Sequence, residues 1–262
     1  MLLAALLPLL AQAAAPPTMD QTKLAVCLDQ ASKNPQTAIV TASEWIGTAT
    51  GAARAYPQQC LGVADTLIER WQPAEQAFLA GRGFAAPADY VTRARLAAMA
   101  GNAALADGRN DAALADFDLA VADAGQGKET ELGGEIQTDR SRALVALGKL
   151  DEAAAALEIA RRDSPQNAET WLLSATLARR QGDLTSAQAR IETAAGLDPK
   201  NPDIGLEAGV IAALAKRDDA ARKSFQSVID TAAGTPEAKA AQGYLDQLGP
   251  PPQPAPAAQA GR

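Results

Sequence analysis

A repeat of 34 residues in the middle of the chain restricts the possible folds most strongly. Segments 148–165, 182–199 and 216–233 align with marker alanines spaced 34 residues apart, and segments 108–125 and 69–81 are looser copies. The marker alanines are Ala74, Ala113, Ala153, Ala187 and Ala221. A unit this short cannot bury an apolar face alone, so the copies must stack on one another.

Each position of the repeat selects one size of side chain. Twelve residues before each marker stands a small residue, namely Gly62, Gly101, Ser141, Ala175 and Gly209. Four residues after it stands a large apolar residue, namely Phe78, Phe117, Leu157, Ile191 and Phe225. Small residues allow two helices to approach closely while the large residue fills the gap, and spacings of four and seven share one helix face. Each copy therefore predicts a helix hairpin.

The period and the pattern Trp171…Ala175…Ala178…Gly182-Asp183-Leu184…Ala187…Ile191…Ala194…Pro199 resemble the tetratricopeptide repeat family. The resemblance covers residues 55–233 and is most specific over 134–233. It implies an all-α, right-handed solenoid of about five helix hairpins. Gly108, Gly148 and Gly182 then end the first helix of each pair in the left-handed conformation. The longer spacing between Ala113 and Ala153 places extra residues in the connection 125–134.

The predicted organisation has four parts. Residues 1–13 read as a signal peptide, and 14–54 as helices broken at Asn34-Pro35 that can be aligned as a degenerate repeat with Ala38 as its marker. The solenoid spans 55–248, and Pro236–Leu248 reads as an amphipathic capping helix. The Pro/Ala-rich tail 249–262 is expected to be extended and disordered.

The first residues carry a targeting pattern. Leu2–Ala11 is apolar but shorter than a membrane span, and Ala11-Gln12-Ala13 fits a cleavage signature. No Lys or Arg precedes the apolar run, so an uncleaved anchor or a buried segment stays open, as does a weaker lipoprotein reading at Cys27. Cleavage predicts a periplasmic or secreted protein of a bacterial envelope, with no stable membrane span afterwards.

The chain has two cysteines, Cys27 and Cys60. An even count in an exported protein suggests a disulfide, with two buried free thiols as the alternative. In the register of the resemblance both cysteines fall on first helices of adjacent repeats, which makes the bridge plausible.

Composition excludes several kinds of chemistry. The chain has no histidine, which removes the usual general base and the commonest metal ligand. A net charge of −7 argues against nucleic acid as a ligand. The sequence contains neither GxxxxGK[ST] nor GxGxxG, so we expect no cofactor, no metal site and no catalytic residues. Carboxylate pairs such as Asp218-Asp219 fit a helix start better than acid–base catalysis.

The resemblance implies a groove that binds a protein or peptide and is lined by first helices. The register selects Arg95, Asn102, Glu135, Asp139, Arg142, Glu169, Thr176, Arg179 and Arg180. The Arg179-Arg180 pair suggests an acidic ligand, since guanidinium groups clamp carboxylates; the alternative is that all these residues are solvated. Trp71 and Trp171 read as core residues, and Trp45 is undecided. The predicted function is a non-enzymatic scaffold or adaptor, with a self-associating structural protein or a regulatory subunit of an envelope enzyme as alternatives.

Overall fold

In the computed structural model, residues 16–250 are described and are all-α, with no strand among them. The predicted signal peptide and most of the predicted tail lie outside these residues. The described chain forms two compact units that divide between Ala86 and Pro87, so the expected boundary between 54 and 55 falls inside the first unit. None of the helices within 16–250 is both long and apolar enough to cross a membrane.

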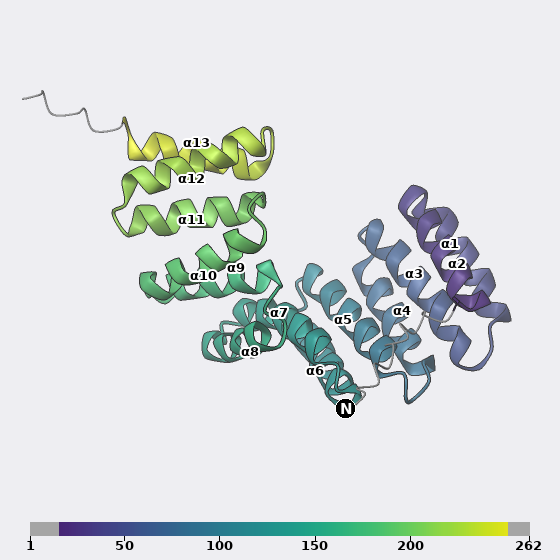
Figure 1. Ribbon diagram of the computed structural model, residues 1–262. Helices are drawn as coiled ribbons and strands as arrows, with labels where there is room; N and C mark the ends of the chain where they lie inside the picture. The colour runs from purple at the N-terminus through teal and green to yellow at the C-terminus, as the bar shows by residue number, and fades with distance from the viewer. Residues whose placement is uncertain (1–15, 251–262) are drawn as a thin grey trace, which may run out of the picture. The chain divides into compact units, whose positions relative to one another are not determined.

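The first unit contains two helix pairs (Figure 1). Its helices are α1 (Met19–Lys33), α2 (Pro35–Thr48), α3 (Ala55–Leu67) and α4 (Trp71–Phe84), with a short 3-10 turn, η1 (Gly51–Arg54), before α3. Asn34 caps α2 with its side chain, and Pro35 occupies the first helical position, where no amide donor is needed. The predicted break at Asn34-Pro35 is therefore confirmed.

A disulfide joins the two first helices of this unit. Cys27 of α1 and Cys60 of α3 are bonded, with their Cα atoms 6.1 Å apart. Both cysteines are buried in one cluster with Ala31, Ala38 and Ala64. The cluster is built largely from alanine, and the covalent link reinforces a small apolar core.

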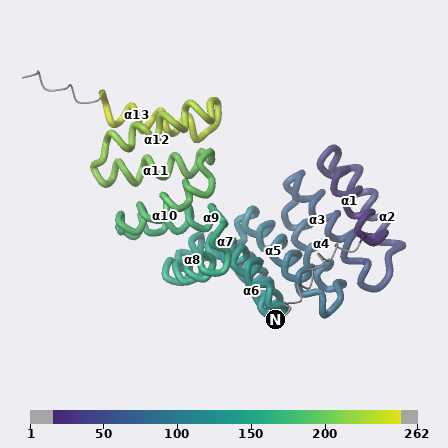
Figure 2. The backbone as a smooth tube through the Cα atoms, viewed as in Figure 1, coloured from purple at the N-terminus to yellow at the C-terminus, as the bar shows by residue number. Residues whose placement is uncertain are grey.

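The second unit contains four helix pairs and a final helix, which follow one another along the chain in Figure 2. The pairs are α5 (Tyr90–Ala106) with α6 (Asn110–Gly127), α7 (Thr130–Ala146) with α8 (Leu150–Asp163), α9 (Ala168–Arg180) with α10 (Leu184–Leu197), and α11 (Pro202–Leu214) with α12 (Asp218–Thr231). The final helix is α13 (Pro236–Leu248).

The structure confirms the predicted repeat register, because the residues at its key positions pack against each other. All five marker alanines and the large residues four positions after them are buried. At Gly62, Gly101 and Gly209, an added Cβ would collide with the ring of Phe78, Phe117 or Phe225 respectively. The glycine thus lets the aromatic ring lie directly against the backbone of the partner helix.

The turn inside each of the five pairs from α3–α4 onward is left-handed at one fixed position, five residues before the marker, whereas Asn34 between α1 and α2 is extended. Gly108, Gly148 and Gly182 have φ of 73°, 74° and 83°, as predicted. The two remaining pairs place Glu69 and Lys216 there, with φ of 59° and 58°. The tertiary fold therefore imposes this conformation even on residues with a Cβ.

The connection at 125–134 differs from the prediction. Helix α6 continues to Gly127 and α7 starts at Thr130, so the extra residues lengthen both helices instead of forming a loop. Lys128 ends α6 in the left-handed conformation. Gly134 serves packing, because a Cβ there would lie 2.8 Å from the backbone nitrogen of Ser164.

The capping helix is confirmed. Helix α13 packs on α11 and α12, with Ala241 in their core cluster. Tyr244 stacks on Phe225 with ring centroids 5.2 Å apart. The last pair therefore has a covered outer face, as the end of a stacked array requires.

Candidate functional site

The first helices of the second unit, α5, α7, α9 and α11, lie next to one another and form one surface, called here the first-helix face. The residues predicted to line a groove come from three of these helices. The structure joins four of them into a polar ladder, defined as Asn102, Asp139, Arg142 and Glu169.

The ladder connects three successive repeats. The Asn102 amide on α5 donates to Asp139 of α7 over 3.0 Å. Arg142, one turn further along α7, donates both to Asp139 and to Glu169 of α9. These contacts tie neighbouring first helices together with charge-assisted hydrogen bonds.

Within the ladder, burial disfavours the charged forms of Asp139 and Arg142, whereas their hydrogen bonds and opposite charges favour them. Burial raises the pKa of Asp139, although the hydrogen bond from Asn102 and the charge of Arg142 act to lower it. Burial disfavours the Arg142 cation, but the carboxylates of Glu169 and Asp139 outweigh it and raise the pKa of Arg142. Both groups are engaged with each other, so the ladder is a structural network along the face.

The sequence suggests that Arg179 and Arg180 together clamp an acidic ligand, but Arg179 is already paired within the protein. Its guanidinium donates twice to Glu207 of α11, over 2.6 and 3.2 Å. This bidentate ion pair is partly buried and occupies the fork that a ligand carboxylate would need. Arg180 is exposed, so it is the member of the pair that can meet a ligand.

Glu207 was not predicted as a site residue. It stands fourteen residues before its marker Ala221, as Asp139 does before Ala153. Extending the register to the last pair identifies it, whereas its pairing with Arg179 depends on side-chain direction. Arg95 and Glu135, also predicted, are exposed on α5 and α7.

A small cavity opens beside the ladder between α7, α8 and α9. Its volume is about 160 Å³, and three of its lining residues, Arg142, Thr176 and Arg180, belong to the predicted set. The remaining lining residues are Ser141, Val145, Leu157, Leu173 and Leu177. A lining of four apolar side chains, two arginines and two hydroxyl groups suits an apolar side chain that is followed by an acidic group.

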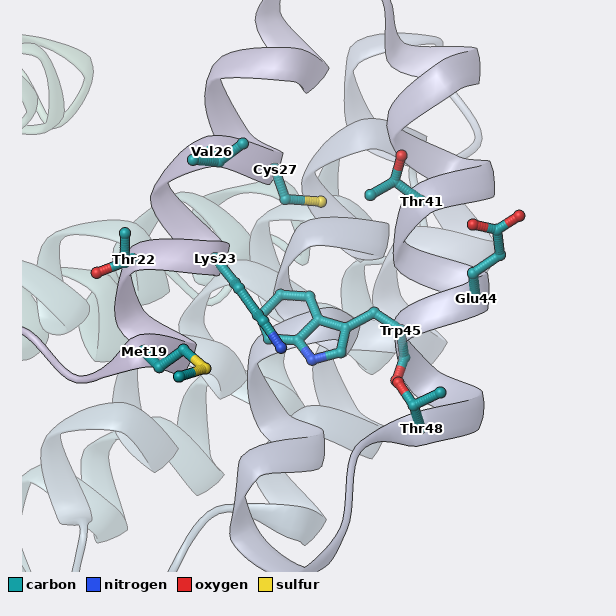
Figure 3. A pocket seen from close by; sticks show the side chains of 9 residues that line it. All are labelled: Met19, Thr22, Lys23, Val26, Cys27, Thr41, Glu44, Trp45 and Thr48. Carbon is teal, nitrogen blue, oxygen red and sulfur yellow. The ribbon is translucent and has the colours of Figure 1, made fainter.

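A second pocket lies on the outer face of the first helix pair, away from any predicted site residue except Cys27 (Figure 3). It has a volume of about 590 Å³ between α1 and α2. Trp45 reaches across it, with the Lys23 ammonium 5.9 Å from its ring centroid. Met19 and Val26 are 75% and 65% exposed, so an apolar surface is open on the first helix pair.

The other two tryptophans are placed differently. Trp171 packs against the core cluster of α9 and α10, and its indole donates to the Pro165 carbonyl over 2.9 Å. Trp71 begins α4 and is partly buried. In the described part of the chain, no three carboxylate or cysteine side chains converge as metal ligands would.

Comparison with known proteins identifies the repeat. A sequence model of the tetratricopeptide repeat family matches residues 138–187 and 172–239. No curated protein matches the chain in sequence.

Solved structures share the fold at low identity. PilW, a type IV pilus biogenesis factor, is 13% identical with a TM-score of 0.69, and the match covers 87% of this chain and 100% of PilW. PilF of Pseudomonas aeruginosa is 14% identical with a TM-score of 0.67, covering 86% and 97%. BtubC of P. vanneervenii is 16% identical with a TM-score of 0.60, covering 94% and 100%. At these identities the likeness establishes the fold.

Proposed function

The chain belongs to the tetratricopeptide repeat family, and on that premise we propose that it is a non-enzymatic scaffold of the cell envelope. Proteins of this fold bind proteins or peptides. The partner segment would lie on the first-helix face over α7 and α9. The observation that carries this proposal is the cavity edged by Arg142, Thr176 and Arg180.

The chemistry of the cavity describes the segment that fits it. Leu157, Leu173 and Leu177 can receive one apolar side chain. Arg180 is exposed at the edge and can pair with a carboxylate of the same segment. Arg142 and Arg179 are held by protein carboxylates, so specificity for an acidic group falls on Arg180. The ligand proposed is therefore an apolar residue with a neighbouring acidic group.

Two observations support a location in the cell envelope. The N-terminal sequence has the pattern of an export signal, and Cys27 and Cys60 form a disulfide. Disulfides persist in oxidising compartments and are rare in a reducing cytosol. A mature chain that begins near Ala14 would keep both cysteines and every described helix.

The test compares three purified baits in an envelope extract: the wild type, Arg180→Glu and Lys200→Glu. Lys200 is exposed outside the cavity and carries the same change of charge. We expect the wild type and Lys200→Glu to retain one partner that Arg180→Glu loses, with mass spectrometry as the readout. Retention of that partner by Arg180→Glu would contradict the proposed site.

The open α1–α2 pocket favours a second candidate, self-association through this end. The occupant would be a second copy, since Lys23 and Glu44 stand on opposite walls of the pocket. A two-fold axis parallel to the helices brings Lys23 of one copy opposite Glu44 of the other. The exposed Met19 and Val26 would then leave water.

Sedimentation over a range of concentrations tests this candidate. Val26→Glu should abolish the increase of mass with concentration that the wild type shows. The matched control is Ala25→Glu, because Ala25 is exposed on another side of α1 and does not line the pocket. A wild type that stays monomeric throughout, or a Val26→Glu variant that associates equally, would exclude this candidate.

A further inference from the structure

Two arginines from different repeats converge on one buried serine. Arg161 of α8 donates to the Ser174 hydroxyl over 2.7 Å, and Arg190 of α10 donates to the Ser174 carbonyl over 3.1 Å. Ser174 lies on α9, which contacts both of these helices, and it is fully buried. The two guanidinium groups therefore contact the same residue of α9 from the two second helices that pack against it.

Neither cation lies within ion-pair distance of a carboxylate among the described residues, although the charge of Arg190 helps to lower the pKa of the exposed Asp183. Arg142 and Arg179 form ion pairs with Glu169 and Glu207, whereas Ser174 offers Arg161 and Arg190 only uncharged oxygens. Glu158, exposed on α8, favours the Arg161 cation without reaching ion-pair distance. Burial and then the charge of Arg190 lower the pKa of Arg161.

Such an arrangement is unfavourable without a ligand. Two like charges held close together repel, and partial burial removes some of the water that would screen them. The position of Arg161 in the last turn of α8 and its contact with Trp171, 5.8 Å from the ring centroid, offset part of this cost. Each guanidinium has five N–H donors, so most remain available to an acceptor after the bond to Ser174.

We propose that Arg161 and Arg190 form a binding site for an oxyanion, either a phosphate or a carboxylate, beside Ser174 and Trp171. An anion between the two guanidinium groups relieves their repulsion and accepts hydrogen bonds from both. The site is distinct from the α7–α9 cavity, because its two cations come from the second helices α8 and α10 and none of its four residues lines that cavity. It could be occupied whether or not a peptide binds at the α7–α9 cavity.

Trp171 reports on this site. The chain has three tryptophans, so the indole N–H groups give three NMR resonances, and the Trp171→Phe variant identifies the one next to Arg161. Inorganic phosphate is titrated at constant ionic strength, with sodium chloride as the balancing salt. We expect a saturable shift of the Trp171 resonance, while those of Trp45 and Trp71 stay fixed. A parallel titration with acetate decides between a phosphate-type and a carboxylate-type ligand by its relative affinity.

Variants assign the shift to the two arginines. Arg161→Gln and Arg190→Gln should each weaken the affinity about tenfold or more, since a hydrogen bond to a charged group is worth about 1.5–3 kcal/mol. The matched control is Arg162→Gln, which removes one exposed cation of α8 that is already paired with Asp163. This variant should bind as the wild type does.

The Arg190→Lys variant distinguishes a loss of binding from a loss of folding, because it keeps the positive charge but lacks the planar guanidinium group. It should weaken phosphate binding without altering the Trp45 and Trp71 resonances. The proposal is overturned if neither phosphate nor acetate produces a saturable shift, or if sodium chloride alone reproduces it. It is equally overturned if Arg162→Gln weakens binding as much as Arg161→Gln does.

Discussion

At fixed positions of the repeat, the size of one residue compensates for that of its partner across the hairpin. Where glycine stands twelve residues before the marker, phenylalanine stands four after it. The pairs with a bulkier first member use smaller second members, Ser141 with Leu157 and Ala175 with Ile191. The five pairs therefore fill a similar space by different divisions of volume, as close packing requires.

Gly101→Ala tests this compensation. A Cβ at this position would lie 2.8 Å from Cε1 of the fully buried Phe117, so we expect a loss of roughly 1–3 kcal/mol in the free energy of unfolding. Adding Phe117→Leu should recover part of the loss. Urea denaturation of both single variants and the double variant measures the coupling.

The control for that experiment is Gly125→Ala in α6. An added Cβ there has no neighbour within 4 Å, so the better helix propensity of alanine should stabilise by about 0.5–1 kcal/mol. A similar gain at Gly101 would refute the packing argument.

Asp203 provides a pH-dependent prediction. Burial, followed by the charges of Glu237 and Glu169, raises the pKa of Asp203. A carboxyl whose pKa is higher in the folded than in the unfolded state destabilises once it ionises, so its contribution worsens as pH rises from about 4. Asp203→Asn should therefore stabilise by a few tenths of a kcal/mol at pH 7, a size limited by solvent screening at this exposed position.

Urea denaturation at neutral pH and near pH 3 checks the sign. The difference between Asp203→Asn and the wild type should shrink at low pH, where both side chains are uncharged. An Asp203→Asn variant that is less stable than the wild type at neutral pH would mean that the ionised carboxylate is favourable in the folded protein, as a helix N-terminus alone would make it.

At the scale of helices, the sequence predicts most boundaries because the chain marks them locally. Pro165 and Pro199 follow α8 and α10, and Asn-Pro pairs start α2 and α11. The glycines of 125–134 predict a loop, but most of this stretch is helical. Gly134 is required there because it permits close contact with Ser164. A glycine needed for packing and one needed for a turn look alike in sequence.

Lys216→Gly is a prediction about the turn between α11 and α12. Lys216 has φ of 58°, a conformation costly for residues with a Cβ and nearly free for glycine. We expect the variant to gain about 0.5–1 kcal/mol in chemical denaturation. Gly182→Ala, at the same position of the preceding pair, should lose about as much. A neutral result for both would mean that this turn conformation carries no strain.

The candidate site was predictable in part for a geometric reason. The register of one repeat places Arg142, Thr176 and Arg180 on the correct helices, and they meet at the cavity. The register does not say which side chain of the next repeat each one reaches. The bond from Arg179 to Glu207 and the convergence of Arg161 and Arg190 on Ser174 both arise from contacts between repeats.

At the scale of the whole molecule, the disulfide belongs to the first unit alone. The bridged residues are 33 apart in sequence, so the chain-entropy model gives a stabilisation of roughly 3–4 kcal/mol. Reduction should lower the unfolding midpoint reported by Trp45 and Trp71 and leave that of Trp171 unchanged. Fluorescence of single-tryptophan variants with and without reductant measures this. Two free thiols in the unreduced protein would contradict the bridge.

The proposed function requires a partner segment that lies over α7 and α9. A photo-crosslinking residue placed at Thr176, with one at the exposed Glu192 of α10 as the control, tests this claim directly in cells that express the full chain. We predict one partner that crosslinks from position 176 and not from position 192, through a peptide with an apolar residue next to an acidic one. Equal crosslinking from both positions, or none from position 176, would contradict the account.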